Sequence, residues 1–355
     1  MPGVPRPKPA LRRNLCRFFA LLLGVCACRA RAAHAQDCAG AAGVSPCFDV
    51  NALWLPAGRA SFLSMPDTRS TSPGQLGFGA AGELIRRPLE LRVASPDRDG
   101  RDVQVVDDVV DLSYFASFGL LRNVEASLLT SIRAHQSGAG VGGIDSQSAL
   151  PLARNAVRDP RVGLAYSLDE ALARPGFGLR LALDATLPLG ERDAFANERS
   201  FVVMPSATLG LRSEAWQLSA EFGMRLRRAV DFGGVVLGNQ GFVALGAAVE
   251  LIHPGWLTLS LEAFGLPALS DSRGRAASPL VSEARLFPAE WLAGVHSSFG
   301  NRSPWTVSLA AGGGIPLSSE TRDTPSGRET SYFTGMTTPD FRSLLVMRYR
   351  APDHH

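Results

Sequence analysis

Few residues of this chain have the types and spacing that nucleophilic or metal chemistry requires. His135 and Ser137 stand two apart near the end of a strand-like stretch, and a Ser–His pair of this kind could hydrolyse a lipid ester. An isolated histidine and serine in a polar loop are the more common arrangement. His253 stands in a His-Pro-Gly turn and His296 in another strand-like stretch, so no two histidines have the spacing of a shared metal site. We therefore expect no enzyme and no metal centre.

Two further patterns could hold a ligand, and each has a simpler explanation. Glu191, Asp193 and Glu198 lie on one connector and could bind Ca²⁺, but a solvated acidic loop has the same composition. The glycine-rich segments 140–143 and 312–316 lack the Lys-Ser/Thr that follows a phosphate-binding loop. We expect no cofactor.

The clearest chemical pattern is a set of charged residues on one face of strand-like stretches. In 177–189, Leu181 and Leu183 alternate with Arg180, Ala182 and Asp184, and neighbouring side chains of a strand face opposite sides. The same alternation predicts eleven charged residues on an inner face: Glu125, Arg133, Arg180, Asp184, Arg212, Glu221, Arg225, Glu250, Glu262, Arg342 and Arg348.

Charges on an inner face must be paired or hydrated. If the space between them is wet, these residues line a narrow pore and set its ion preference. If it is closed, they form a salt-bridge network across it. Both possibilities remain open at this stage.

The elements that position these charges are stretches of about ten to thirteen residues with an aliphatic outer face. We expect twelve, near 75–86, 108–120, 123–135, 160–169, 177–190, 200–213, 215–228, 239–252, 255–266, 289–300, 304–315 and 340–350. The connectors between them are alternately short and long. Trp216, Trp256 and Trp305 each follow a short connector, as residues of an aromatic girdle at one membrane interface would.

This layout predicts an all-β fold, an antiparallel up-and-down transmembrane β-barrel of about twelve strands over residues 74–350. Stretches of this length suit tilted strands that cross a membrane. A secreted β-sandwich, jelly roll or propeller is the alternative, but strands of five or six residues would be usual there.

The N-terminus has the pattern of a secretory signal peptide over residues 1–35. Five basic residues precede the apolar stretch 18–28, and Ala33-His34-Ala35 fits a cleavage site that leaves Gln36 first. An amphipathic cytosolic helix and a lipoprotein cut before Cys26 or Cys28 are the alternatives. We expect residues 36–73 to be an N-terminal periplasmic extension, although they could also tuck into the barrel mouth.

Removal of residues 1–35 would also remove most of the positive charge. The whole chain carries a formal charge of +3, and the 36 basic residues fall to about 29 against 33 acidic ones. The remaining charge, about −4, favours no nucleic-acid partner. Cys38 and Cys47 would be the two remaining cysteines, and an even pair in an exported protein predicts a disulfide. A metal pair is the alternative.

Several segments resemble outer-membrane barrels of known families. The segments are DVVDLSYFASFGLLRNVEASLLTSIRAHQSGAGVG (108–142), RDPRVGLAYSL (158–168), LALDATLPLGERDAFANERSFVVMPSATLGL (181–211) and TTPDFRSLLVMRYR (337–350). They resemble the barrel module of OmpA-family proteins and are similar to transporter barrels of the phenol meta-pathway kind, over roughly 48–350. The chain ends five residues after Arg350, so the resemblance does not imply the peptidoglycan-binding domain of many OmpA-family proteins.

Together these patterns predict an exported protein of the outer membrane, with the signal peptide cleaved. Its expected partners are outer-membrane lipids, the barrel-assembly machinery and a small-molecule solute. The expected function is passive or selective passage of small molecules, as in a porin or transporter. A plugged structural or surface-interaction barrel that acts through its long outer loops is the alternative.

Overall fold

The computed structural model describes residues 45–93, 101–144, 151–168, 176–198, 200–232, 235–252, 256–269, 281–298, 303–324 and 327–350. All of them belong to one compact unit, Cys38–His355, and Met1–Asp37 is assigned to a second. The expected signal peptide and Cys38 lie outside the described residues. Cys47 is buried and disulfide-bonded, and its pairing with Cys38 stays a prediction.

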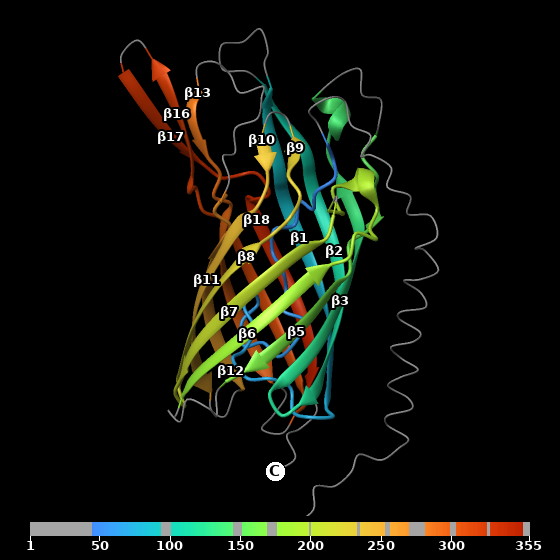
Figure 1. Ribbon diagram of the computed structural model, residues 1–355, viewed down its shortest axis with the longest axis vertical. Coiled ribbons are helices and arrows are strands. Elements are labelled where there is room, and N and C mark those ends of the chain that lie inside the picture. The colour runs from blue at the N-terminus through green and yellow to red at the C-terminus, as the bar shows by residue number, and fades with distance from the viewer. Residues whose placement is uncertain are drawn as a thin grey trace, which may run out of the picture. The chain divides into compact units, whose positions relative to one another are not determined.

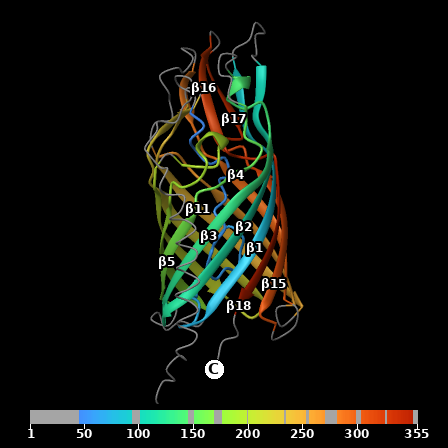
Figure 2. The ribbon, with the colours of Figure 1, turned by 90° about the vertical axis from the view of Figure 1, so that its right-hand side faces the viewer.

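Twelve antiparallel strands close into a barrel, in which β1 pairs with β18 (Figures 1 and 2). Each predicted stretch coincides with one strand, so the predicted fold is confirmed. The strands are β1 (Leu76–Val93), β2 (Arg101–Leu121), β3 (Val124–Ser137), β5 (Arg161–Ser167), β6 (Phe177–Thr186), β7 (Val202–Arg212), β8 (Trp216–Arg225), β11 (Gln240–Ile252), β12 (Leu257–Gly265), β14 (Ala289–Ser298), β15 (Trp305–Gly314) and β18 (Phe341–Arg350). No helix among the described residues is long and apolar enough to cross a membrane.

Alternation along each strand separates an apolar outer face from an inner face. On β6, Leu181 and Leu183 are 46% and 51% exposed, whereas Arg180 is only 4% exposed. On β12, Leu259 and Leu261 are exposed and Glu262 is buried. The aliphatic residues that a soluble protein would bury therefore form the outer surface of the wall, as a lipid-facing barrel requires.

The three tryptophans lie at the end of the barrel where the short connectors are. Trp216 and Trp256 are exposed, and the Trp305 ring packs edge-on against the rings of Phe78 and Tyr349 at 5.7 and 5.1 Å. Strands β1, β15 and β18 thus contribute one aromatic cluster at this edge. An amphipathic ring suits a membrane interface, in agreement with the expected girdle.

The long connectors contain strands where the sequence predicted irregular loops. These are β4 (Ala156–Val157), β9 (Val230–Phe232), β10 (Val235–Leu237), β13 (Val281–Arg285), β16 (Ser318–Thr324) and β17 (Gly327–Phe333). Strand β4 pairs with β3, β9 pairs with β10, and β13, β16 and β17 form a separate sheet beyond the wall (Figure 1). Alternating Ser, Thr and Tyr residues in these connectors favour extended pairing, and hairpin pairing satisfies their backbone groups.

Residues 45–72 run through the lumen, and we call them the threaded segment (blue in Figures 1 and 2). For its described part, the position in the lumen agrees with the alternative expectation that residues 36–73 tuck into the barrel, and a periplasmic extension stays a prediction for the remainder. The segment supplies Leu53, Leu55, Phe62, Leu63 and Met65 to a core that it shares with inward residues of the wall. These apolar side chains are buried against the wall. Outside the barrel they would contact water, and the free energy gained from their burial would be lost.

We expect a lysine on the outer face to impair assembly more than a change on the inner face. Leu183→Lys places a charge in the lipid-facing belt, where it costs about 2–4 kcal/mol at the membrane midplane. Asp184→Asn keeps the side-chain shape on the opposite face. The measurement is the yield of folding into lipid vesicles. The folded fraction is read from its heat-modifiable mobility in gel electrophoresis. A lower yield for Asp184→Asn than for Leu183→Lys would mean that the faces are reversed.

Candidate functional site

Asn51 of the threaded segment contacts charged residues from three different strands. Its amide nitrogen donates to Glu83 Oε2 at 2.7 Å and to Asp111 Oδ2 at 3.1 Å. Its amide oxygen accepts from Arg342 Nη1 at 2.9 Å. One neutral side chain therefore bridges β1, β2 and β18, and its donors and acceptor are used where burial would make an unpaired group costly.

Arg342 is a fully buried cation of the wall. Its guanidinium binds Glu290 on β14 through two hydrogen bonds, from Nε to Oε2 at 2.6 Å and from Nη2 to Oε1 at 2.9 Å. It also pairs with Glu83. One arginine thus lies between two carboxylates, and all three side chains are almost completely buried. The flat guanidinium suits such bidentate pairing.

A second ionic cluster lies where the threaded segment enters the barrel from the end with the long connectors. Arg133 pairs with Asp111 at 2.9 Å and with Asp49 at 3.3 Å. Arg158 pairs with the same two carboxylates, at 2.7 Å for Asp49 and 3.1 Å for Asp111. Arg133 also donates to the carbonyl of Phe195 at 2.8 Å, which joins the loop after β6 to this cluster.

Apolar packing joins three elements at the same end. The rings of Phe48, Phe195 and Phe232 contact one another edge-on, with centroids 5.2–5.6 Å apart. They come from the threaded segment, the loop after β6 and β9. Aromatic pairs in this geometry add stabilisation to that from buried area, so the rings hold these three elements together at the long-connector end.

Carboxylates also hold the long connectors together at this end. Asp159 accepts hydrogen bonds from the backbone N–H groups of Gly190 and Glu198 at 2.8 and 2.7 Å. Burial raises the pKa of Asp159 to about 7, and these two N–H groups oppose that rise. Burial also raises the pKa of Glu198, and its ion pair with Arg227 at 2.8 Å opposes the change.

Two arginines of the wall enclose Trp54 in the middle of the threaded segment. The guanidinium carbons of Arg161 and Arg225 lie 4.8 and 4.4 Å from the centroid of the Trp54 ring. Arg225 also donates to the carbonyl of Ala52 at 2.9 Å, and Arg161 donates to that of Leu55. Cation–π contacts strengthen when they are desolvated, and here they fix the segment between β5 and β8.

Carboxylates of the wall bind the backbone of the segment further along the lumen. Glu262 accepts from the N–H groups of Leu63 at 3.0 Å and Ser64 at 2.7 Å, and also from the Ser64 hydroxyl. Glu125 accepts from the N–H of Thr71 at 2.8 Å and pairs with Arg180 at 2.8 Å. The backbone groups of a non-periodic segment thus obtain partners from the wall, as buried N–H groups must.

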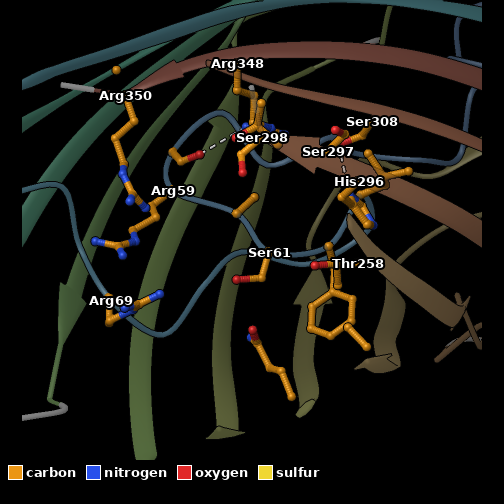
Figure 3. Close-up of a pocket in the computed structure, with 18 of the residues that line it drawn as sticks. Arg59, Ser61, Arg69, Thr258, His296, Ser297, Ser298, Ser308, Arg348 and Arg350 are labelled. Atoms are coloured by element: carbon orange, nitrogen blue, oxygen red, sulfur yellow. Dashed lines mark hydrogen bonds between the residues drawn. The ribbon is translucent and has the colours of Figure 1, made fainter. Parts of the chain in front are cut away.

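A cavity of about 870 Å³ remains between the segment and the short connectors (Figure 3). Its lining includes Arg59 and Arg69 of the segment, and His296 and Arg348 of the wall. The His296 ring bridges the hydroxyls of Ser260 and Ser308, each at 2.8 Å. The volume is in the range of small-molecule sites.

The structure brings most of the predicted inward charges into contact with the threaded segment. Direct hydrogen bonds or ion pairs to it come from Glu125, Arg133, Arg212, Arg225, Glu262, Arg342 and Arg348. Arg180 acts through Glu125, and Glu250 lines the cavity. Asp184 and Glu221 are inward on β6 and β8, where no direct bond to the segment is found among the described residues.

Several functional residues were not predicted from the sequence. Glu83, Asp111, Arg161 and Glu290 lie on strands that were predicted, at positions where alternation would place them inward. The same rule could therefore have found them. Asn51 and Trp54 had no such signal, because their segment has no periodicity.

The other candidate chemistry is not assembled by the fold. His135 is exposed at the end of β3, and no hydrogen bond joins it to Ser137 within the described ranges. Glu198 pairs with Arg227, and in the part of the chain that the structure describes no three His, Cys, Asp or Glu residues group as metal ligands.

Comparisons with known proteins show the fold and no family. No family model matches the chain, and no curated protein matches its sequence. A solved outer membrane channel from Pseudomonas putida F1 is similar over 82% of this chain and 100% of its own, with 12% identity and a TM-score of 0.55. The NanC porin matches 78% of this chain and 100% of its own, with 8% identity and a TM-score of 0.42. The CymD monoaromatic hydrocarbon channel matches 80% of this chain and 90% of its own, with 10% identity and a TM-score of 0.36.

We expect loss of the Glu262 carboxylate to loosen the threaded segment. Glu262→Ala leaves the N–H groups of Leu63 and Ser64 buried without an acceptor, at about 1–3 kcal/mol for each group. Glu262→Gln keeps one acceptor oxygen and should have the smaller effect. Trypsin cleavage after Arg59 in the folded protein measures the loosening. Equal resistance of the wild type and both variants would show that Glu262 does not hold the segment.

We expect Arg342→Gln to destabilise the barrel strongly. The change leaves Glu83 and Glu290 buried without their cation, and breaking a buried ion pair in this way costs about 3–5 kcal/mol. Arg87→Gln is the matched control, because Arg87 pairs with Asp340 at an exposed site where such pairs contribute about 0–1 kcal/mol. Urea unfolding in detergent measures both. Similar midpoints for the two variants would contradict the assignment.

Proposed function

We propose that this protein is an outer-membrane channel for small solutes whose threaded segment acts as a gate. One observation carries the proposal: the lumen holds a whole segment of chain in addition to the inward side chains of the wall. An eight-stranded barrel is filled by its own side chains, whereas wider barrels leave a channel. Movement of the segment would therefore leave a passage lined by polar and charged groups.

The contacts that hold the segment support a gate. The wall binds it largely through hydrogen bonds to main-chain carbonyls and N–H groups, such as those of Ala52, Leu63 and Ser64. Water can replace each of these bonds when the segment moves, so displacement exchanges hydrogen bonds rather than removing them. The Pseudomonas putida protein of similar fold is described as an outer membrane channel, which accords with this function.

The same proposal covers location and partners. A signal peptide over residues 1–35 would direct export, the barrel-assembly machinery would insert the strands, and outer-membrane lipids would surround the leucine-rich outer face. The short connectors and the 870 Å³ cavity would then face the periplasm. Resemblance to the OmpA family and to meta-pathway transporters stays a prediction.

A permanently plugged barrel is the second candidate, and apolar packing favours it. Phe62, Leu63 and Met65 of the segment are almost fully buried against the wall, together with Leu344 and Val346 of β18. Displacing them would expose apolar surface at about 25 cal/mol per Å². Such a protein would act through the strands that extend beyond the wall.

We expect Trp54→Ala to increase solute passage. The change removes the ring that Arg161 and Arg225 enclose. Both guanidinium groups then lose their cation–π contact with the threaded segment, which is held less firmly. Trp256→Ala is the matched control, because Trp256 is an exposed residue immediately before β12. Planar-bilayer recordings should show more frequent or larger openings for Trp54→Ala alone.

The plugged alternative predicts a different record. Wild type, Trp54→Ala and Trp256→Ala would all fold and insert but carry no current. That outcome would overturn the proposed gate in favour of a structural barrel.

A further inference from the structure

We propose that the cavity at the short-connector end is a binding site for a small organic anion, a carboxylate attached to an apolar body. This inference deepens the proposed function by naming the class of solute. The lining contains five arginines and two glutamates, and the arginines come from both the threaded segment and the wall. The arginines are Arg59, Arg69, Arg212, Arg348 and Arg350, and the glutamates are Glu214 and Glu250.

One buried carboxylate pairs with three of these arginines. Asp67 of the threaded segment pairs with Arg59 at 3.3 Å, Arg69 at 2.9 Å and Arg212 at 3.1 Å. Three guanidinium groups therefore share Asp67, and the five lining arginines still outnumber Asp67, Glu214 and Glu250 taken together. A bound anion would reduce this excess where the wall limits access of water and salt.

Arg348 lines the cavity and keeps one donor without a hydrogen-bond partner among the described residues. Its Nη1 donates to the carbonyls of Pro56 and Gly58 at 2.9 and 3.1 Å, and its Nη2 is buried without a hydrogen-bond partner in the described structure. Its guanidinium carbon lies 4.4 Å from the centroid of the Phe115 ring. This arginine is fixed in position, yet one of its donors lacks an acceptor. A buried donor in that state favours a ligand that accepts a hydrogen bond.

Arg350 adds a second cation to the lining. Its side chain lies beside that of Arg59 in Figure 3, it is exposed, and no ion pair to it is found over the described ranges. Arg59 of the threaded segment and Arg350 of β18 can thus approach one ligand carboxylate from two sides. Planar guanidinium groups suit this geometry better than ammonium groups do.

The rest of the lining determines the body of the ligand. Phe62, Leu63 and Phe115 are among the apolar side chains of the lining. Thr258, Ser298 and Ser308 add hydroxyls (Figure 3). A purely inorganic anion would leave the apolar part of the cavity without a partner. A carboxylate with an aromatic or aliphatic body can use both kinds of surface.

A second, small cavity of the lumen has the opposite charge balance in its lining. This cavity, of about 30 Å³, is lined by Asp49, Glu83, Asp159 and Glu198 against Arg158 and Arg161. It has room for about one water molecule. Attraction of an organic anion is therefore specific to the short-connector end.

Equilibrium binding to the full-length protein in detergent tests the inference. Benzoate is the probe, benzamide is a neutral molecule of nearly the same shape, and inorganic phosphate tests charge alone. Calorimetry should show benzoate binding at least tenfold more tightly than either of the other two. Benzamide binding as tightly as benzoate, or phosphate doing so, would overturn the assignment of a carboxylate on an apolar body.

Two variants locate the binding. Arg350→Gln and Arg69→Gln should each weaken benzoate binding by about three- to tenfold and leave benzamide unchanged. Arg87→Gln, at the other end of β1, is the control and should have no effect. Unchanged benzoate binding in both cavity variants would overturn the site.

The binding and conductance experiments distinguish failure of the anion site from failure of the gate. If benzoate binds as expected but bilayers carry no current, the anion site stands and the gate does not. If current flows but benzoate does not bind, the gate stands and the anion site is overturned.

Discussion

Ionised side chains inside this barrel depend on partners or water within the barrel, because the outer face of the wall is aliphatic and offers none. The threaded segment meets much of this need. Asn51 joins Glu83, Asp111 and Arg342, and Glu262 accepts two backbone N–H groups of the segment. The dependence is mutual, since a non-periodic segment with buried backbone groups would be costly anywhere that lacked such partners. Wall and segment are therefore one folded unit.

Alternation of residues was sufficient to predict the wall. It predicted all twelve strands and both faces, because the period of two follows directly from strand geometry and a lipid-facing side must be apolar. The strands in the long connectors were missed for a physical reason. They are short, and their pairing depends on neighbours such as β9 on β10, which local sequence does not specify.

The position of the threaded segment was not predictable in the same way. Residues 45–72 have no period, so nothing in them indicates which surface they contact. The wall did contain a sign of it: Leu344, Leu345, Val346 and Met347 form a continuous apolar run on β18. A strand that faces lipid on one side and a wet pore on the other should alternate, whereas a strand buried on both faces has such a run. Leu344 and Val346 are indeed buried in the core shared with the segment.

The central claim is that the threaded segment occupies the lumen and is bound there by the wall. Hydrogen–deuterium exchange of the protein in lipid nanodiscs tests this most directly, at the backbone N–H groups of Leu63 and Ser64. Both donate to the buried carboxylate of Glu262, so their exchange should be as slow as that of β12 strand amides. Exchange at the rate of a solvated loop would contradict the account, because the segment would then lie outside the lumen.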